Sequence, residues 1–334
     1  MAASKPLIDA LGRRITYLRV SVTDRCDLRC VYCMSERMTF ADKPDVLAFD
    51  ELDRLCALFI ERGVRKLRIT GGEPLLRKGI DQFLLGLRRH LDHGALDELT
   101  LTTNGTQLSA HADALANAGI ERVNVSLDTI NHKTFAKIAR SDRLPMVLAG
   151  IEAARAAGLK IKLNTVALRG VNEHEIPSLI EWVHERGMEI TLIETMPLGE
   201  IDEDRTAQFV PLTDVRRDLE TIWTLADERH CSGGPARYVR VRETGGRLGF
   251  ITPITNVFCA TCNRVRLTCK GELFMCLGRD DRIDLGAALR AGAGDAELDR
   301  MLDQGMQHKP AAHDFRIEPA RSPAVQRHMS VTGG

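Results

Sequence analysis

The chain lacks an excess of either charge, and it lacks any long apolar run. Its 46 lysines and arginines are balanced by 46 aspartates and glutamates, which gives a formal net charge of zero. A general nucleic-acid-binding protein normally carries a basic excess, so this balance argues against that class. No stretch reaches the roughly 18 apolar residues of a membrane span, and the first residues form no apolar signal-peptide core. We therefore expect a cytoplasmic protein without nucleic-acid or membrane partners.

Cysteines are too few for a disulfide-rich scaffold. The 334 residues include nine cysteines, and six of these fall in two tight groups. Because disulfides are rare in reducing compartments, such grouping favours metal ligation. The sequence thus predicts two metal centres.

The sequence also lacks a G-x-G-x-x-G turn after its first strand-like run, which argues against a dinucleotide-binding sheet. Instead, strand-like and helix-like runs alternate in about six βα units, and this alternation predicts a parallel sheet. A partial (β/α)6 TIM-type barrel fits best, with its chemistry at the C-terminal ends of the strands. Short strand-like runs replace this rhythm later in the chain. We therefore expect an α/β fold with a barrel over residues 1–196 and a smaller C-terminal α+β domain over residues 197–334.

The first cysteine group lies in the segment SVTDRCDLRCVYCMS, directly after a predicted strand. Cys26, Cys30 and Cys33 have the spacing C-x3-C-x2-C. A structural zinc site usually recruits four ligands, whereas three cysteines on a [4Fe–4S] cluster leave one iron free for a small molecule. A zinc knuckle and a set of free thiols are the alternatives. The spacing favours the cluster.

The second group consists of Cys259, Cys262 and Cys276, and it again has three members. Cys269 is a poor candidate for a fourth ligand. The predicted hairpin puts it at a turn, about 16 Å from Cys276 at the rise of a strand. We therefore prefer a second [4Fe–4S] cluster with an open iron over zinc.

Three further motifs carry less information on their own. Arg264 and Arg266 alternate on the strand after Cys262, so they share a face and suit a phosphate, although a solvated strand face is the alternative. The motif GGEP at residues 71–74 follows a strand and lets the backbone approach a ligand, although it also suits a plain turn. The terminal Gly333 and Gly334 read by themselves as a flexible tail.

Together these motifs resemble a known family. The first cysteine group, with Tyr32 before its last cysteine, and the GGEP motif resemble the radical S-adenosylmethionine (radical SAM) enzymes. The C-x2-C-N-R-x-R-L-T…C stretch and the final Gly-Gly resemble, among these enzymes, the GTP 3′,8-cyclase family over nearly the whole chain. The resemblance implies two [4Fe–4S] clusters, with S-adenosyl-L-methionine (SAM) bound at the first and GTP at the second.

The resemblance also implies roles for residues at matching positions. The cluster ligands would be Cys26, Cys30, Cys33, Cys259, Cys262 and Cys276. Contacts with SAM would come from Tyr32, Gly72, Ser126 and Met196. Contacts with GTP would come from Arg19, Arg68, Thr102, Lys162, Arg264, Val265 and Arg266. The residues that serve the reaction itself would be Arg264, Arg266, Gly333 and Gly334. For two of the GTP contacts a nearby residue is the alternative: Thr103 for Thr102, and Lys160 for Lys162.

The implied reaction is a lyase reaction, the first step of molybdenum cofactor biosynthesis. A 5′-deoxyadenosyl radical would take the ribose 3′ hydrogen of GTP, and ring closure at C8 would give (8S)-3′,8-cyclo-7,8-dihydroguanosine 5′-triphosphate. The implied partners are GTP, an electron-donor protein and, by pathway, cyclic pyranopterin monophosphate synthase, and a homodimer is a candidate assembly. A peptide-modifying radical SAM enzyme and a non-catalytic metal-binding module are the alternatives.

Overall fold

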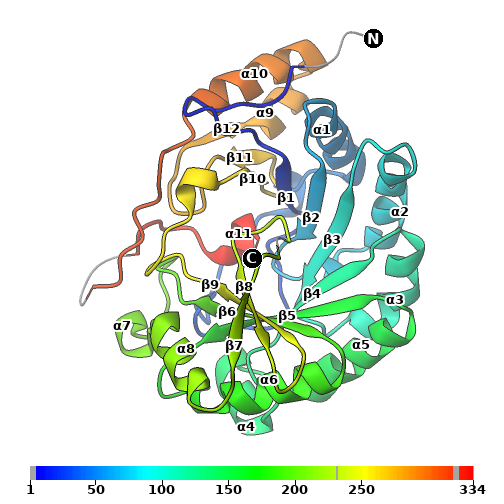
Figure 1. Ribbon diagram of the computed structural model, residues 1–334. Coiled ribbons are helices and arrows are strands. Elements are labelled where there is room, and N and C mark those ends of the chain that lie inside the picture. The colour runs from blue at the N-terminus through cyan, green and yellow to red at the C-terminus, as the bar shows by residue number, and fades with distance from the viewer. Residues whose placement is uncertain (1–4, 231, 319–322, 334) are drawn as a thin grey trace.

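A single curved sheet of twelve strands organises the computed structural model, which describes residues 5–230, 232–318 and 323–333 (Figure 1). Its strand order is β12-β11-β10-β1-β2-β3-β4-β5-β6-β9-β8-β7. The first six strands are parallel neighbours, as the βα rhythm predicts. The strands are β1 (Tyr17–Ser21), β2 (Lys66–Thr70), β3 (Glu98–Thr103), β4 (Arg122–Ser126), β5 (Lys160–Ala167), β6 (Glu189–Glu194), β7 (Leu225–Glu228), β8 (Arg237–Val241), β9 (Arg247–Ile251), β10 (Arg264–Leu267), β11 (Glu272–Phe274) and β12 (Arg282–Asp284).

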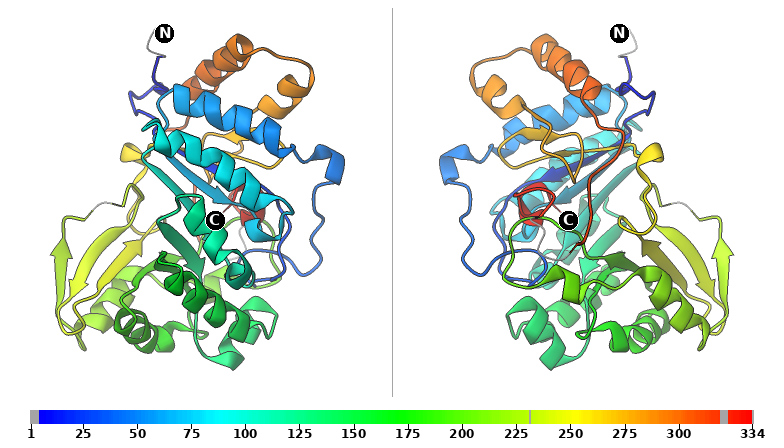
Figure 2. Two further views of the ribbon diagram at one scale, coloured as in Figure 1. Left: turned by 90° about the vertical axis from the view of Figure 1, so that its right-hand side faces the viewer. Right: turned by 90° about the vertical axis from the view of Figure 1, so that its left-hand side faces the viewer.

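Helices cover the convex face of the sheet, and they connect its parallel strands (Figures 1 and 2). Leucine, isoleucine and valine side chains at helical spacing pack against the outward residues of the strands in one large core. The helices are α1 (Phe49–Glu61), α2 (Ile80–Asp92), α3 (Leu108–Asn117), α4 (His132–Ala139), α5 (Leu144–Ala156), α6 (Ile176–Glu185), α7 (Arg205–Gln208), α8 (Leu212–Glu220), α9 (Leu285–Arg290), α10 (Asp295–Gln307) and α11 (Met329–Thr332).

The concave face of the sheet is polar. On β1, Leu18 and Val20 belong to the core, whereas Arg19 between them lines a cavity. On β2, Arg68 has the same position, and it lies in register with Arg19. A parallel sheet buried on both faces normally has apolar residues on both. Polar residues inside the curve therefore mark this face as a functional surface.

The C-terminal part of the chain extends both ends of the barrel sheet. β10 pairs in parallel with β1, and β9 pairs in parallel with β6. Antiparallel hairpins then complete each end, with β11 and β12 on one side and β8 and β7 on the other. Figure 2 shows these hairpins flanking the barrel. The expected C-terminal α+β segment is thus built into the same sheet.

Sequence analysis did not locate the C-terminal helices α7 to α11, of which α10 has 13 residues, nor α4, β7 and β12. The last three have 8, 4 and 3 residues respectively. Elements this short carry too few apolar repeats for a periodic signal, and β7 (LADE) is mostly polar or half-exposed. Of the helices in the described part of the chain, none combines the length and the hydrophobicity needed to cross a membrane.

Candidate active site

A cavity of about 210 Å³ lies against the concave face of the sheet, and we call it the central cavity. It receives side chains from β1 to β5, from β10 and from the loops that carry the second cysteine group. Most of the predicted site residues meet here. Those that line it are Arg19, Tyr32, Arg68, Thr102, Ser126, Lys162, Met196, Cys259, Cys262, Arg264, Arg266 and Cys276.

The first cysteine group lies in the loop that follows β1. Cys26 Sγ accepts hydrogen bonds from the backbone N–H of Leu28 at 3.5 Å and from Asn104 Nδ2 at 3.6 Å. Burial raises the pKa of Cys26 to about 11 and that of Cys33 to about 12, so these thiols need an electropositive partner to ionise. Iron supplies such a partner, and N–H donors aimed at a ligand sulfur suit a thiolate. The donor set therefore fits an iron–sulfur cluster.

The GGEP motif holds this cysteine loop in place. Gly72 N donates to Thr23 O at 2.7 Å, and a Cβ on Gly72 would lie 2.3 Å from Arg25 O. The glycine is thus required by close contact with the cysteine loop, a reason that sequence analysis did not give. The buried carboxylate of Glu73 accepts hydrogen bonds from Thr103 Oγ1 at 2.8 Å and from Asn104 N at 2.6 Å. It joins the loops after β2 and β3.

Tyr32 is held by a carboxylate to which sequence analysis gave no role, although its segment follows a predicted strand. Tyr32 OH donates to Asp128 Oδ2 at 2.8 Å, and Asp128 Oδ1 accepts from Val166 N at 2.8 Å. Burial raises the pKa of Asp128 to about 6. Asp128 lies two residues after the end of β4, so its position at a C-terminal strand end was the available signal.

The middle of the central cavity is strongly cationic. Arg19 and Arg68 line it, and the Nε atoms of both are buried without a hydrogen-bond partner in the described structure. The hydroxyl groups of Thr102 and Tyr17 are buried and unpartnered in the same way. Orphaned donors of this kind are rare in folded proteins, and they suit an anionic ligand with many acceptors.

Tyr17 was missed by sequence analysis. Burial by itself raises the pKa of this phenol, but the positive charges of Arg68, Arg19, Lys66 and Arg264 outweigh burial and lower the pKa to about 8. Tyr17 starts β1 and lies in register with both Lys66 and Arg264. Its position on the same strand face as Arg19 was the signal.

The two members of each pair of neighbouring candidates have different surroundings. Thr102 lines the central cavity, whereas Thr103 Oγ1 is bonded to Glu73. Lys162 lines the cavity and donates to Tyr238 OH at 2.5 Å, whereas Lys160 is exposed and lies 3.7 Å from Glu121. Burial lowers the pKa of Lys162 to about 7, and nearby cations contribute in the same direction.

The second cysteine group lines the central cavity, and the predicted hairpin behind it is present. Cys269 is buried at the turn of this hairpin, where its carbonyl accepts from Leu47 N at 2.8 Å. Burial raises the pKa of Cys262, but Lys309 and Arg264 outweigh it and lower the pKa to about 7. A thiol poised in this way fits a thiolate ligand.

The chain terminus reaches the same site. Arg266 Nη1 donates to the carbonyl oxygen of Gly333, and a Cβ on Gly333 would lie 2.1 Å from Thr70 Cγ2. Gly334 lies outside the described residues. Val265 is buried in the core between Arg264 and Arg266, so its side chain points away from the cavity.

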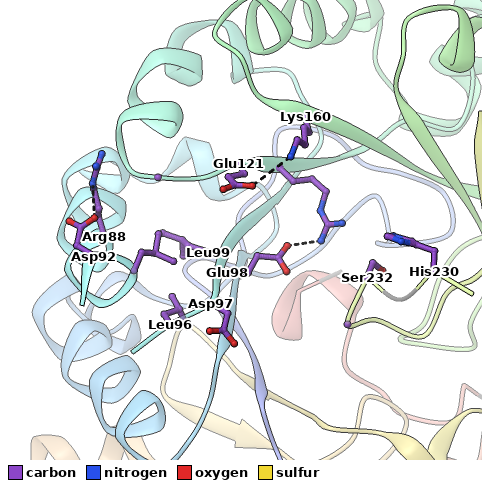
Figure 3. Close-up of a pocket in the computed structure, with 14 residues that line it drawn as sticks. Arg88, Asp92, Leu96, Asp97, Glu98, Leu99, Glu121, Lys160, His230 and Ser232 are labelled. Carbon is purple, nitrogen blue, oxygen red and sulfur yellow. Dashed lines mark hydrogen bonds and ion pairs between the residues drawn. The ribbon is translucent and has the colours of Figure 1, made fainter. Parts of the chain in front are cut away.

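A larger hollow of about 630 Å³ lies at the opposite, N-terminal ends of β3, β4 and β5 (Figure 3). Its charged side chains are already paired, as Arg88 with Asp92, Lys160 with Glu121 and Glu98 with Arg122. We assign no ligand to this hollow, because side chains that neutralise each other attract a charged ligand only weakly.

In the described residues, no three histidine, cysteine, aspartate or glutamate side chains gather closely enough to hold one metal ion. A zinc site needs its ligands around one point, whereas a cluster takes each thiolate on a different iron. The choice between a cluster and zinc at the second cysteine group stays a prediction.

Comparison with known proteins agrees with this architecture. Residues 20–183 match the model of the Radical SAM superfamily, and residues 188–315 match the model described as Molybdenum Cofactor Synthesis C. Among solved structures, SuiB from Streptococcus suis, bound to S-adenosylmethionine, has a TM-score of 0.61. The two proteins are 17% identical, over 90% of this chain and 68% of SuiB, so the likeness concerns the fold. The fold and the first cysteine loop define a radical SAM protein.

Full-length relatives narrow the assignment. The GTP 3′,8-cyclase of Erythrobacter litoralis is 60% identical over the whole of both chains. That of Caulobacter vibrioides is 61% identical over 98% of this chain and 94% of its own. The chain belongs to the GTP 3′,8-cyclase family. This membership confirms the predicted partial barrel and the SAM-dependent first cluster, and the second cluster stays a prediction.

Proposed function

We propose that the chain converts GTP to (8S)-3′,8-cyclo-7,8-dihydroguanosine 5′-triphosphate in the central cavity, the first step of molybdenum cofactor biosynthesis. One observation carries the proposal. The cavity joins Tyr32, beside the first cysteine group, to the second cysteine group through a cluster of buried, unpartnered cationic donors. Such a cluster matches a triphosphate, because guanidinium and phosphate form strong charged hydrogen bonds. The relatives named GTP 3′,8-cyclase support the same substrate.

At the first site, Cys26, Cys30 and Cys33 would hold the [4Fe–4S] cluster. Tyr32, Ser126 and Met196 would contact SAM from the cavity wall, and Gly72 would do so through its backbone. When bound, the cluster and SAM supply the primary carbon radical that removes the ribose 3′ hydrogen. Asp128 keeps Tyr32 in a fixed orientation for this contact.

The substrate side of the cavity fixes GTP. Arg19, Arg68 and Lys162 would bind the phosphates and sugar, with Thr102 as a hydroxyl donor, and Arg264, Val265 and Arg266 would contact GTP from β10. Cys259, Cys262 and Cys276 would hold a second [4Fe–4S] cluster with one iron free for guanine. A fixed triphosphate keeps the 3′ and C8 positions in reach of each other, and low exposure keeps water from quenching a radical.

The C-terminal tail would serve the reaction as well. Gly333 touches Arg266 through its carbonyl, so the tail fixes the guanidinium at the substrate side. We propose the same role for Gly334. In this division of labour, residues 1–196 carry the radical-forming part, and residues 197–334 carry the second cluster.

The proposal also includes the cellular compartment and the partner proteins. Six cysteines that serve as metal ligands need a reducing compartment, which supports the cytoplasm. An electron-donor protein would reduce the first cluster, and cyclic pyranopterin monophosphate synthase would consume the product. The homodimer stays a prediction.

Arginine variants test the proposal. The anaerobically reconstituted chain is supplied with GTP, SAM and dithionite, and both 5′-deoxyadenosine and cyclised GTP are quantified. Arg264→Ala and Arg266→Ala should each lower cyclised GTP by roughly 10- to 100-fold, which is the worth of one charged hydrogen bond. Iron content should stay at about eight atoms per chain, as two clusters require.

Arg282→Ala is the matched control, because this half-exposed arginine on β12 pairs with Glu272 away from the cavity. It should keep full turnover. Wild-type formation of cyclised GTP by the Arg264 or Arg266 variants would overturn the assignment of these residues, and the absence of product from the unmodified chain would overturn the function.

A further inference from the structure

Lys309 is a buried lysine beside the second cysteine group. It follows α10, and only 4% of its surface is exposed. Its Nζ donates to Arg264 O at 2.8 Å and to Met275 O at 2.6 Å. A third contact runs to Cys262 Sγ at 3.7 Å. The two carbonyls thus direct the remaining N–H of the ammonium toward a predicted cluster ligand.

This ammonium has no carboxylate partner within 4.0 Å among residues 5–230, 232–318 and 323–333. The carboxylate of Asp9 influences the ammonium through its charge, but Asp9 is already paired with Arg13 at 2.5 Å. A buried cation without a counter-charge is costly, so a partner anion is expected. Among the described residues, Cys262 Sγ is the one hydrogen-bond contact of Lys309 that can become an anion.

Arg13 fixes the segment that presents Lys309. It donates from Nη2 to Pro310 O at 2.7 Å and from Nη1 to Cys259 O at 2.9 Å. Arg13 therefore joins the residue after Lys309 to the loop of the second cysteine group. Because Asp9 neutralises Arg13, the uncompensated charges that face Cys262 are those of Lys309 and Arg264.

We propose that Lys309 is a positioning residue for the second cluster. Its ammonium balances the charge of the Cys262 thiolate and donates a hydrogen bond to the ligand sulfur. Both effects stabilise the bound cluster, and both raise its reduction potential, since positive charge and N–H···S contacts favour the more negative, reduced form. The inference rests on the proposed function, because it assumes that a cluster occupies this site.

The test isolates the second cluster. In the full chain carrying Cys26→Ala, Cys30→Ala and Cys33→Ala, only the second cysteine group can hold a cluster, so about four irons per chain are expected after reconstitution. Lys309→Met and Lys309→Gln are added separately to this background. Met removes both charge and donor, whereas Gln keeps a donor and removes the charge. Iron, sulfide and the midpoint potential of the cluster signal are measured.

Both variants should bind less iron, or should keep the cluster with a more negative midpoint potential. Lys270→Met is the matched control. Lys270 lies at the turn of the β10–β11 hairpin, near the second cysteine group in the sequence, but its ammonium pairs with Asp45 at 3.1 Å. It should leave both measurements unchanged. If Met prevents folding, judged by circular dichroism, the Gln variant decides.

The outcomes separate the two claims. A background chain that binds no iron although Lys309 is intact would overturn the proposed second cluster. A background chain with about four irons, whose iron content and potential both survive Lys309→Met or Lys309→Gln, would overturn the role of Lys309 alone.

Discussion

Buried charge distinguishes the residues of the central cavity from those of the core. Tyr17 and Lys162 are both buried, and their pKa values of about 8 and about 7 lie far below the ordinary values of these groups. For Lys162 the main cause is burial, and for Tyr17 it is the surrounding cations, which outweigh burial. Groups of this kind change charge in the range where enzymes work.

We predict that these two residues make GTP affinity depend on pH. A bound triphosphate favours protonated Lys162 and neutral Tyr17, so it raises both pKa values and binding takes up protons. Affinity is therefore full below about pH 7 and falls as pH rises through about 7 for Lys162 and about 8 for Tyr17. The fall should reach up to tenfold per pH unit for each group.

Titration calorimetry between about pH 7.5 and pH 9 measures this slope, in a range where phosphate, with its last pKa of about 6, is already ionised. Lys162→Met and Tyr17→Phe should each flatten the slope, whereas Lys160→Met, on the exposed side of the same strand, should leave it unchanged. A pH-independent affinity of the unmodified chain would refute the prediction.

Close backbone contact selects Gly72. The Cβ of Gly72→Ala would lie 2.3 Å from Arg25 O and 2.6 Å from Asp24 O, and backbone atoms cannot move away as a flexible side chain can. We expect the cysteine loop to shift, so that reconstituted iron falls from about eight to about four atoms per chain.

Iron analysis and circular dichroism check this expectation together. Gly86→Ala on α2 is the control, because its Cβ would meet only Arg89 Nη1 at 3.7 Å, and alanine should stabilise that helix by about 0.5–1 kcal/mol. Full iron content in Gly72→Ala would show that the loop tolerates the displacement.

At the scale of secondary structure, buried carboxylates join the loops at the C-terminal ends of the strands. Glu73 joins the loops after β2 and β3. Glu194, at the end of β6, accepts from Leu212 N at 3.2 Å, Ile254 N at 2.9 Å and Thr255 N at 3.1 Å. Glu194 thereby fastens the start of α8 and the loop after β9 to the barrel.

Glu194→Gln should lower the free energy of unfolding by about 1–3 kcal/mol, because an amide cannot accept on both sides and leaves a buried N–H unpaired. Urea unfolding of the cluster-free chain measures the loss. Glu185→Gln on α6 serves as the control, since Glu185 is exposed and lies 3.7 Å from Arg186. Equal stabilities of the two variants would contradict the role of Glu194.

At the scale of the whole molecule, the C-terminal part closes the edges of the barrel sheet. β10 covers β1, and β9 covers β6, so removal of residues 197–334 exposes two unpaired strands at once. It also removes the wall of the central cavity that carries the second cysteine group. Exposed edge strands tend to pair between molecules.

A chain that ends at Met196 should therefore aggregate or unfold, although residues 20–183 match a family model by themselves. Size-exclusion chromatography and thermal unfolding, run beside the full chain, measure this. A monomeric fragment with a cooperative transition would show that the barrel is stable without its C-terminal strands.

The sequence by itself determined the features that depend on local spacing. The two cysteine groups, the GGEP turn and the alternation of strands and helices are each encoded within a few tens of residues. Strand alternation also predicted that Arg264 and Arg266 share a face, and both line the central cavity. Short elements such as α4, β7 and β12 were beyond reach, because so few residues show no period.

Only the tertiary structure decided which distant residues meet. Lys309 reaches Cys262 across 47 positions and Tyr32 reaches Asp128 across 96, and no local pattern encodes either contact. The structure likewise places Thr102, and not Thr103, at the central cavity, because the direction of a side chain depends on the register between strands. Spacing along the chain fixes which chemistry is available, whereas packing between strands and loops fixes which groups act together.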